Sequence, residues 1–152
     1  MVKRRSKKKG PVQAKKISYD GINFASGLER YTYIALKKNK LFEGYENEIF
    51  QLIEGFNFNN ESFEKQANGK GEYTNRGQKK MLGIKYTPDF VGKDYIIECK
   101  GRANESFPIR WKLFKLWLTK NKIGKTLYKP QNQKEVDMTI ILIKENRKRK
   151  RG

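Results

Sequence analysis

Two blocks of positive charge limit the part of this chain that can fold. Residues 3–9 contain six lysine or arginine residues in seven, residues 147–151 contain five in five, and neither block contains an acidic residue. Like charges repel one another when packed together, so both ends are expected to be mobile arms. The sequence therefore predicts a basic arm over residues 1–16, one folded domain over residues 17–144 and a basic tail over residues 145–152.

The rest of the chain is basic as well. Lysine and arginine number 35 against 16 aspartate and glutamate, a formal net charge of +19, and the two blocks supply only +11 of it. Such a chain favours a polyanionic partner, because each Lys or Arg that neutralises a phosphate releases a bound counterion. Basic runs also occur as localisation signals or solubilising tails, but the basic body favours nucleic acid. The block residues expected to contact phosphates are Lys3, Arg4, Arg5, Lys7, Lys8, Lys9, Arg147, Lys148 and Arg149.

The absence of histidine excludes much of enzyme chemistry. The chain contains no His and a single Cys, Cys99, so Ser-His-Asp and Cys-His nucleophiles, His-ligated zinc sites and internal disulfides are excluded. Acid–base or metal chemistry would therefore depend on carboxylates, lysine or tyrosine. No apolar run approaches the ~18 residues of a membrane span, and the N-terminus lacks the apolar stretch of a signal peptide, so we expect no membrane partner.

The apolar pattern between the basic blocks predicts an α/β domain with a single mixed β-sheet flanked by helices. The spacing of Ser26 and Glu29 is that of a capping box and predicts a helix start. Residues 54–83 are rich in Asn and Gly and are expected to form a long hairpin or a mobile surface insertion. The expected elements are a strand or turn over residues 17–24, a helix to about residue 39, strands over 45–53, 84–91 and 95–100, a helix over 107–121 and a buried strand over 136–143.

A hairpin around residues 92–94 brings two carboxylates and a lysine together. Side chains alternate between the faces of a strand, so Glu98 and Lys100 share one face and Cys99 points to the other, toward the core. A hairpin loop of two or four residues would place Asp89 directly across from Glu98. A three-residue loop would send Asp89 to the wrong face unless a bulge corrected it.

This group of side chains suits phosphodiester hydrolysis. Paired carboxylates without histidine form a hard oxygen site for Mg²⁺ or Mn²⁺, which makes a bound water more acidic. Lys100 would orient the attacking water or neutralise negative charge as it forms. The alternative interpretation is an ordinary salt bridge on a strand. Glu29 also has two interpretations: its spacing from Ser26 favours a helix cap over a metal ligand, although one residue can do both.

Three short strings in the chain resemble a known nuclease family. Pro88-Asp89 followed by Glu98-Cys99-Lys100 resembles the signature of the PD-(D/E)xK nuclease superfamily. The strings at residues 24–29, 86–90 and 98–101 are FASGLE, YTPDF and ECKG, and in this order they are similar to those of the phage endonuclease I group of Holliday-junction resolvases. The resemblance covers roughly residues 17–118 and implies a restriction-endonuclease-like core.

The resemblance also implies a set of functional residues. Glu29, Asp89, Glu98 and Lys100 fall on the catalytic positions of the family. Glu29, Asp89, Glu98 and the main-chain carbonyl of Cys99 would hold Mg²⁺ or Mn²⁺. The resemblance raises Glu29 from a cap to an expected ligand. The implied reaction is metal-dependent cleavage that leaves a 5′-phosphate and a 3′-hydroxyl.

Substrate and assembly follow from the same resemblance. It implies branched DNA, above all four-way junctions, as the substrate, and a homodimer that exchanges elements between its subunits. The expected location is the cytoplasm of a bacterial or phage-infected cell. Residues 54–83 have no recognisable counterpart in the family, and we interpret them either as a β-ribbon that contacts DNA or as part of a dimer exchange.

Basic residues follow the carboxylate motif closely. Arg102, Arg110 and Lys112 are expected to hold phosphates of the scissile strand, with a solvated helix face as the alternative. Two other functions stay open at this point. One is a different PD-(D/E)xK nuclease, nicking or recombination-associated. The other is a non-catalytic basic nucleic-acid-binding protein, in which Asp89, Glu98 and Lys100 form a salt-bridge cluster that binds no metal.

Overall fold

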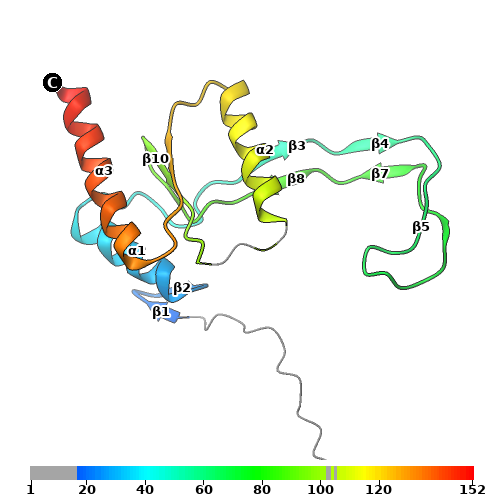
Figure 1. The fold of residues 1–152 in the computed structure, drawn as a ribbon, viewed down its shortest axis with the longest axis horizontal. Helices are drawn as coiled ribbons and strands as arrows, with labels where there is room; N and C mark the ends of the chain where they lie inside the picture. The colour runs from blue at the N-terminus through cyan, green and yellow to red at the C-terminus, as the bar shows by residue number, and fades with distance from the viewer. Residues whose placement is uncertain (1–16, 102–103, 105) are drawn as a thin grey trace, which may run out of the picture.

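A three-stranded mixed sheet lies at the centre of the computed structural model, which describes residues 17–101, 104 and 106–152 (Figure 1). Strand β10 (Tyr95–Ile97) lies between β11 (Thr126–Tyr128), which runs parallel to it, and β9 (Phe90–Val91), which runs antiparallel. The α/β class predicted from the sequence is confirmed. The predicted phosphate contacts outside the described residues are Lys3, Arg4, Arg5, Lys7, Lys8, Lys9 and Arg102.

The other described strands form four separate two-stranded antiparallel sheets, β1–β2, β3–β8, β4–β7 and β5–β6. Within the described residues the strands are thus not joined into the single sheet that the sequence led us to expect. The remaining elements are β1 (Ile17–Tyr19), β2 (Ile22–Phe24), α1 (Gly27–Lys38), β3 (Phe50–Ile53), β4 (Phe56–Phe58), β5 (Phe63–Glu64), β6 (Thr74–Asn75), β7 (Lys79–Met81), β8 (Ile84–Tyr86), α2 (Phe107–Lys120) and α3 (Gln133–Arg151).

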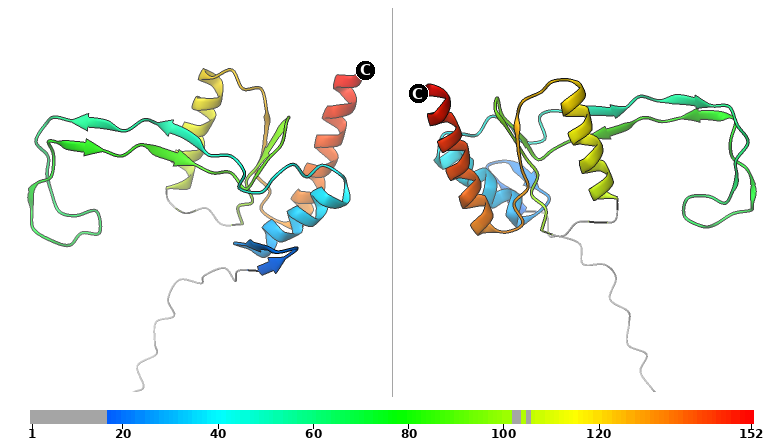
Figure 2. Two further views of the ribbon diagram at one scale, coloured as in Figure 1. Left: turned by 180° about the vertical axis from the view of Figure 1, so that it is seen from behind. Right: turned by 45° about the horizontal axis from the view of Figure 1, so that its top comes forward.

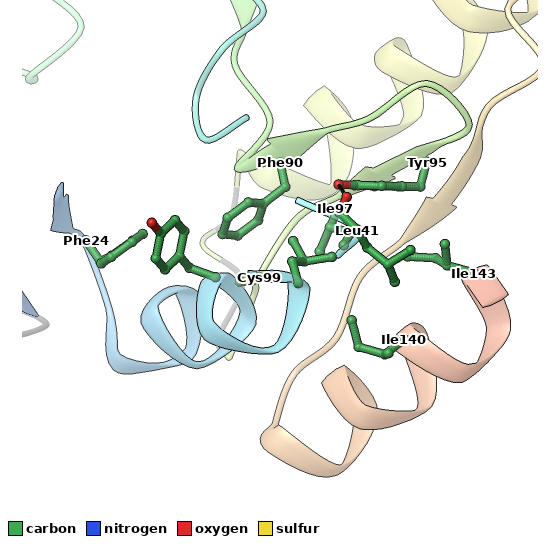
Figure 3. Packing of buried hydrophobic residues seen from close by; sticks show 10 residues of the cluster. Phe24, Leu41, Phe90, Tyr95, Ile97, Cys99, Ile140 and Ile143 are labelled. Atoms are coloured by element: carbon green, nitrogen blue, oxygen red, sulfur yellow. Dashed lines mark hydrogen bonds between the residues drawn. The ribbon is translucent and has the colours of Figure 1, made fainter. Parts of the chain in front are cut away.

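Alternation along β9 and β10 divides the hydrophobic core into two clusters, one on each face of the central sheet. Phe90 and Ile97 pack with residues of α1 and α3, and Cys99 belongs to the same cluster (Figure 3). Val91 and Ile96 pack instead with the buried face of α2. Helices therefore cover both faces of this sheet, α1 and α3 on one and α2 on the other.

Residues 54–83 form most of a long two-stranded ribbon, as the hairpin interpretation predicts. The pairs β3–β8, β4–β7 and β5–β6 are nested, so the chain runs out along one strand and returns along the other. The ribbon projects away from the helices, and its outer part contacts no other element in any view (Figure 2). Phe56, Phe63 and Tyr73 on this ribbon are all at least half exposed.

The C-terminal segment is a helix, and the prediction of a buried strand over residues 136–143 is wrong. Asn132 caps α3, because its side chain accepts a hydrogen bond from the Glu135 backbone N–H at 2.9 Å. The buried residues of α3 are Val136, Thr139, Ile140 and Ile143, which is helical spacing. The run of β-branched residues suggests a strand because exposed apolar residues, such as Ile141 and Leu142, interrupt the helical spacing of the buried ones. None of the described helices is long and apolar enough to span a membrane.

The predicted basic tail is part of the same helix, and one of its residues is packed against the domain. The Arg147 guanidinium donates to both carboxylate oxygens of Asp94, at 2.9 and 2.8 Å, and lies 3.4 Å from Glu43. The hydrogen bond from Arg147 holds the pKa of the Asp94 carboxyl below its usual value. Because Asp94 lies in the loop between β9 and β10, this pair ties the end of α3 to that hairpin. The expectation of a mobile arm is therefore wrong for residues 145–151.

Replacing Arg147 by Met should lower the free energy of unfolding by about 1–2 kcal/mol at pH 7, because a charged hydrogen-bonded pair is lost. The folded-state pKa of Asp94 is depressed, so this contribution is present above the ordinary carboxyl pKa and is lost as the pH falls through the folded value. The difference between wild type and Arg147→Met in urea unfolding should thus shrink below about pH 4. The matched control, Arg149→Met, changes an exposed residue of the same helix and should stay within about 0.5 kcal/mol of wild type. Equal loss in both variants would contradict the role of the pair.

Candidate active site

The β9–β10 hairpin has a two-residue loop, which is one of the two lengths that bring Asp89 across from Glu98. Val91 pairs with Ile96 and Phe90 with Ile97, and the Gly92 N–H donates to the Tyr95 carbonyl at 2.9 Å. Continuing this register by one step places Asp89 opposite Glu98. The Cys99 N–H donates to Asp89 Oδ2 at 2.7 Å, so the carboxylate is fixed to the neighbouring strand.

Glu29 reaches this group from the first turn of α1, and it serves as a cap at the same time. Its backbone N–H donates to Ser26 Oγ at 3.2 Å, and its Oε1 accepts from the same hydroxyl at 3.1 Å. Its second oxygen, Oε2, accepts from the Tyr45 hydroxyl at 2.5 Å. The Tyr45 ring is held between Phe24 and Phe90. The two interpretations of Glu29 are therefore compatible in this structure.

Glu46 completes the group, and the sequence analysis did not identify it. Its φ of +46° interrupts the strand that was expected over residues 45–53, so regular pairing begins only at Phe50. The Glu46 N–H donates to the Asp89 carbonyl at 2.8 Å. Carboxylate oxygens of Glu29, Glu46 and Asp89 all lie within 4.8 Å of one another. No local motif marks Glu46, because its position depends on a contact across 43 residues of chain.

Glu98 and Lys100 continue in an extended conformation beyond the end of β10. The N–H groups of Glu98 and Lys100 donate to the carbonyls of Tyr128 and Pro130, both at 3.0 Å. The Cys99 N–H between them points instead to Asp89, so residues 98–100 are extended. In an extended segment the Cys99 side chain lies on the opposite face from those of Glu98 and Lys100. The Cys99 thiol lies 3.2 Å from Thr32 Oγ1 in the α1 cluster, and burial raises its pKa. The expectation that Cys99 faces the core agrees with this placement.

Two aromatic residues hold the Glu98 and Lys100 side chains. Glu98 Oε2 accepts from the buried Tyr86 hydroxyl at 2.7 Å. The Lys100 ammonium lies over the Phe107 ring, 4.6 Å from its centroid, which is the range of a cation–π contact. Glu98 is not one of the three carboxylates that lie within 4.8 Å of one another. It lies next to this group, across the β9–β10 hairpin from Asp89.

Burial and repulsion from neighbouring carboxylates make ionisation of the Asp89 and Glu98 carboxyls unfavourable. Glu29, Asp89 and Glu98 are only 7%, 9% and 8% exposed. Burial raises the pKa of Asp89, and the charges of Glu98 and Glu29 raise it further. Burial also raises the pKa of Glu98, although the Tyr86 hydroxyl and the Lys100 charge act in the other direction. In the part of the chain that the structure describes, no Lys or Arg nitrogen lies within 4.0 Å of these carboxylates.

This charge arrangement does not support the salt-bridge alternative. A structural ion pair would place the Lys100 ammonium against Asp89 or Glu98, whereas the ammonium lies over Phe107. Convergent carboxylate oxygens with no Lys or Arg nitrogen of the described residues within 4.0 Å form a hard oxygen site, the donor set that suits Mg²⁺ or Mn²⁺. The residues present therefore fit a divalent cation.

Two of the predicted phosphate contacts lie on α2, and they differ in position. Arg110 and Lys112 are both exposed. Burial and the charge of Glu98 raise the pKa of Tyr86, whose hydroxyl binds Glu98, and the charge of Arg110 acts in the other direction, so Arg110 lies on the site side of the helix. Lys112 is two positions away, about 200° around the helix, and lines a surface hollow with Pro108 and Leu113.

The chain belongs to the family described as "Protein of unknown function (DUF1064)", whose model matches residues 8–129. This range contains all the carboxylates of the site, together with Cys99 and Lys100, and it ends before α3. Neither the curated proteins nor the solved structures compared with the chain include a match.

The Asp89→Asn variant should be more stable than wild type in EDTA at pH 8, by about 1 kcal/mol or more. The folded-state pKa of Asp89 is raised, so metal-free wild type loses stability as the pH rises above the ordinary carboxyl pKa of about 4. An amide at this position removes the repulsion and still accepts the Cys99 N–H. The advantage should disappear in urea unfolding near pH 3, where Asp89 is mostly protonated in both states.

The same chemical change at Asp94 provides the control. Asp94 is paired with Arg147, so Asp94→Asn should destabilise the protein in EDTA at pH 8. Destabilisation of both variants would mean that Asp89 contributes a favourable structural interaction, and the electrostatic description of the site would be wrong.

Proposed function

We propose that this protein is a divalent-metal-dependent DNA endonuclease that cleaves branched DNA such as four-way junctions. The observation that supports it best is the convergence of Glu29, Glu46 and Asp89 beside Glu98, with no cation within 4.0 Å in the described chain. Buried carboxylates that repel one another cost stability. A site of this kind is more readily explained by a ligand of opposite charge than by folding.

The residues that would hold Mg²⁺ or Mn²⁺ are Glu29, Asp89 and Glu98, with the Cys99 carbonyl as the resemblance implies, and Glu46 is added by its position. A divalent ion in such a site makes a water more nucleophilic and stabilises charge on the leaving oxygen. Tyr45 and Tyr86 orient two of the carboxylates through hydrogen bonds to Glu29 and Glu98. Such hydrogen bonds fix ligand geometry and hold the carboxylates as acceptors.

Lys100 would act on the phosphate rather than on the carboxylates. Its extended backbone is fixed by the Pro130 carbonyl, and its ammonium over Phe107 is close enough to the site to lower the pKa of Glu98. From there it would orient the attacking water or neutralise charge that develops on the scissile phosphate. Arg110, whose charge reaches Tyr86, would hold a neighbouring phosphate of the same strand.

Several finer features belong to the same proposal. The mixed sheet of β9, β10 and β11, covered by helices on both faces, agrees with a restriction-endonuclease-like core. The net charge of +19 favours DNA over a small substrate. The choice of branched DNA and of a homodimer rests on the resemblance of three sequence strings to the junction-resolving endonucleases. A nicking or recombination-associated nuclease of the same superfamily, or a non-catalytic nucleic-acid-binding protein, is the alternative.

The test is a gel assay with a labelled four-way junction and a matched linear duplex, in Mg²⁺, in Mn²⁺ and in EDTA. Wild type should cut the junction only when metal is present, and Asp89→Asn should lose at least about 100-fold in rate while it still binds the junction. Equal cutting of both substrates would retain the nuclease and reject the junction preference. Binding without cutting in either metal would favour the non-catalytic alternative.

Glu46 provides a separate test, because it was found only from the structure. Glu46→Gln should lower the cleavage rate at least about 10-fold, since it removes a charge from the group of three carboxylates. Glu48→Gln is the matched control, because Glu48 is exposed, two residues away and outside that group. Equal rates in the two variants would show that Glu46 does not contribute to the site.

A further inference from the structure

A second charged feature lies away from the carboxylate site, at the other end of α1. A hollow of about 290 Å³ opens between the residues that directly follow α1 and the C-terminal half of α3. Its lining residues are Asn39, Lys40, Leu41, Lys144, Arg147, Lys148 and Arg151. Five of these seven residues are cationic, and none is acidic.

The cations of α3 that line this basic hollow share one face of the helix. Lys144, Arg147, Lys148 and Arg151 are spaced by three and four residues, which places them side by side. Like charges at this spacing destabilise a helix by a few tenths of a kcal/mol per pair. A helix C-terminus favours cations in general, but that effect does not require them to face one hollow.

The charge in the basic hollow is only partly neutralised. Arg147 is paired with Asp94 and Glu43. Lys144 donates to the neutral amide oxygen of Asn39 at 2.5 Å. Lys40, Lys148 and Arg151 make no side-chain hydrogen bond or ion pair to any described residue. The hollow therefore carries an excess of positive charge that an anion would offset.

We propose that the basic hollow binds the phosphate backbone of a DNA segment that flanks the cleavage site; this inference rests on the proposed function for its choice of DNA. Lys144 and Arg151 are seven residues apart, about 10 Å along the helix, comparable with the rise of three base pairs at 3.4 Å each along the axis of a DNA duplex. The row of cations thus fits several successive phosphates better than one small anion.

The hollow is far enough from the carboxylates to contact a different part of the substrate. Glu29 lies in the first turn of α1 and Lys40 just after its end, a separation of about 16 Å along the axis. The end of α3 also lies on the opposite side of the molecule from the β-ribbon (Figure 1). A bound duplex would then be held at two separate places, the carboxylate site and the basic hollow.

The experiment compares two double variants of the same helix, α3. Lys148→Gln with Arg151→Gln removes two cations that line the hollow, and Lys134→Gln with Lys150→Gln removes two exposed cations that do not line it. Each pair removes two positive charges, so the change in net charge is identical. Binding is measured by fluorescence anisotropy with a labelled four-way junction, in EDTA, over a series of NaCl concentrations.

The hollow pair should weaken binding about 10-fold or more at 0.1 M salt and lower the slope of log K against log [salt] by about 2, because about 0.9 is lost for each phosphate contact. The control pair should change the slope by less than about 0.5. Thermal melting should show no loss of stability in the hollow pair, because it removes repulsion between like charges. Equal effects of the two pairs, or no effect of either, would overturn the proposal.

Two further comparisons separate this proposal from others. Cleavage by wild type in Mg²⁺ is measured separately from binding in EDTA. Binding through the hollow without cleavage would refute the proposed nuclease activity and leave the role of the hollow in DNA binding standing. Cleavage by wild type, together with equal DNA binding by the two double variants, would refute the role of the hollow and leave the nuclease activity standing. Vesicles of phosphatidylserine and phosphatidylcholine test a membrane surface: selective loss of vesicle binding in the hollow pair, with unchanged DNA binding, would also overturn the proposal.

Discussion

The two-residue loop between β9 and β10 determines the arrangement of the candidate site. It sets the register in which Asp89 opposes Glu98, and the Cys99 N–H then fixes Asp89 across the pair. The same alternation turns Ile97 and Cys99 toward α1 and α3 and turns Ile96 and Glu98 toward α2. One added residue in this loop would reverse every one of these directions. Arg147 binds Asp94 at the loop itself, so the C-terminal helix supports the register from outside the sheet.

The candidate site gathers negative charge and the basic hollow gathers positive charge in the same folded chain. In the site, burial raises the pKa of Asp89 and Glu98, and repulsion from neighbouring carboxylates raises both further. In the hollow, cations on one helix face repel one another at the surface. Both arrangements oppose stability in the isolated protein, and the two-cluster core must compensate for them. Phosphodiester chemistry gives a common explanation, because a divalent cation relieves the first repulsion and phosphate groups relieve the second.

Sequence reasoning was successful where short-range rules apply. The hairpin around residues 92–94 and the α1 cap both depend on residues within a dozen positions of one another, and the structure contains both. The register of the hairpin stayed open between loop lengths in the sequence, and the two-residue loop of the structure determines it. It failed at Glu46, which reaches the site only through a contact with Asp89 and a backbone conformation that is rare for glutamate. It also failed at α3, where a β-branched run suggested a strand although Asn132 and Glu135 provide a helix start. The exposed Ile141 and Leu142 obscured the helical period there.

The nested pairing of the β-ribbon makes its length independent of the site. Strands β3 and β8 leave the body together, and everything beyond them pairs only within the ribbon. Removing two residues from each of the two outer strands would shorten the ribbon by about 7 Å and would preserve the face that each remaining side chain occupies. Such deletions leave Tyr86 and the Asp89 register where they are. The same candidate site can therefore carry ribbons of different length, provided that the length changes by an even number of residues in each strand.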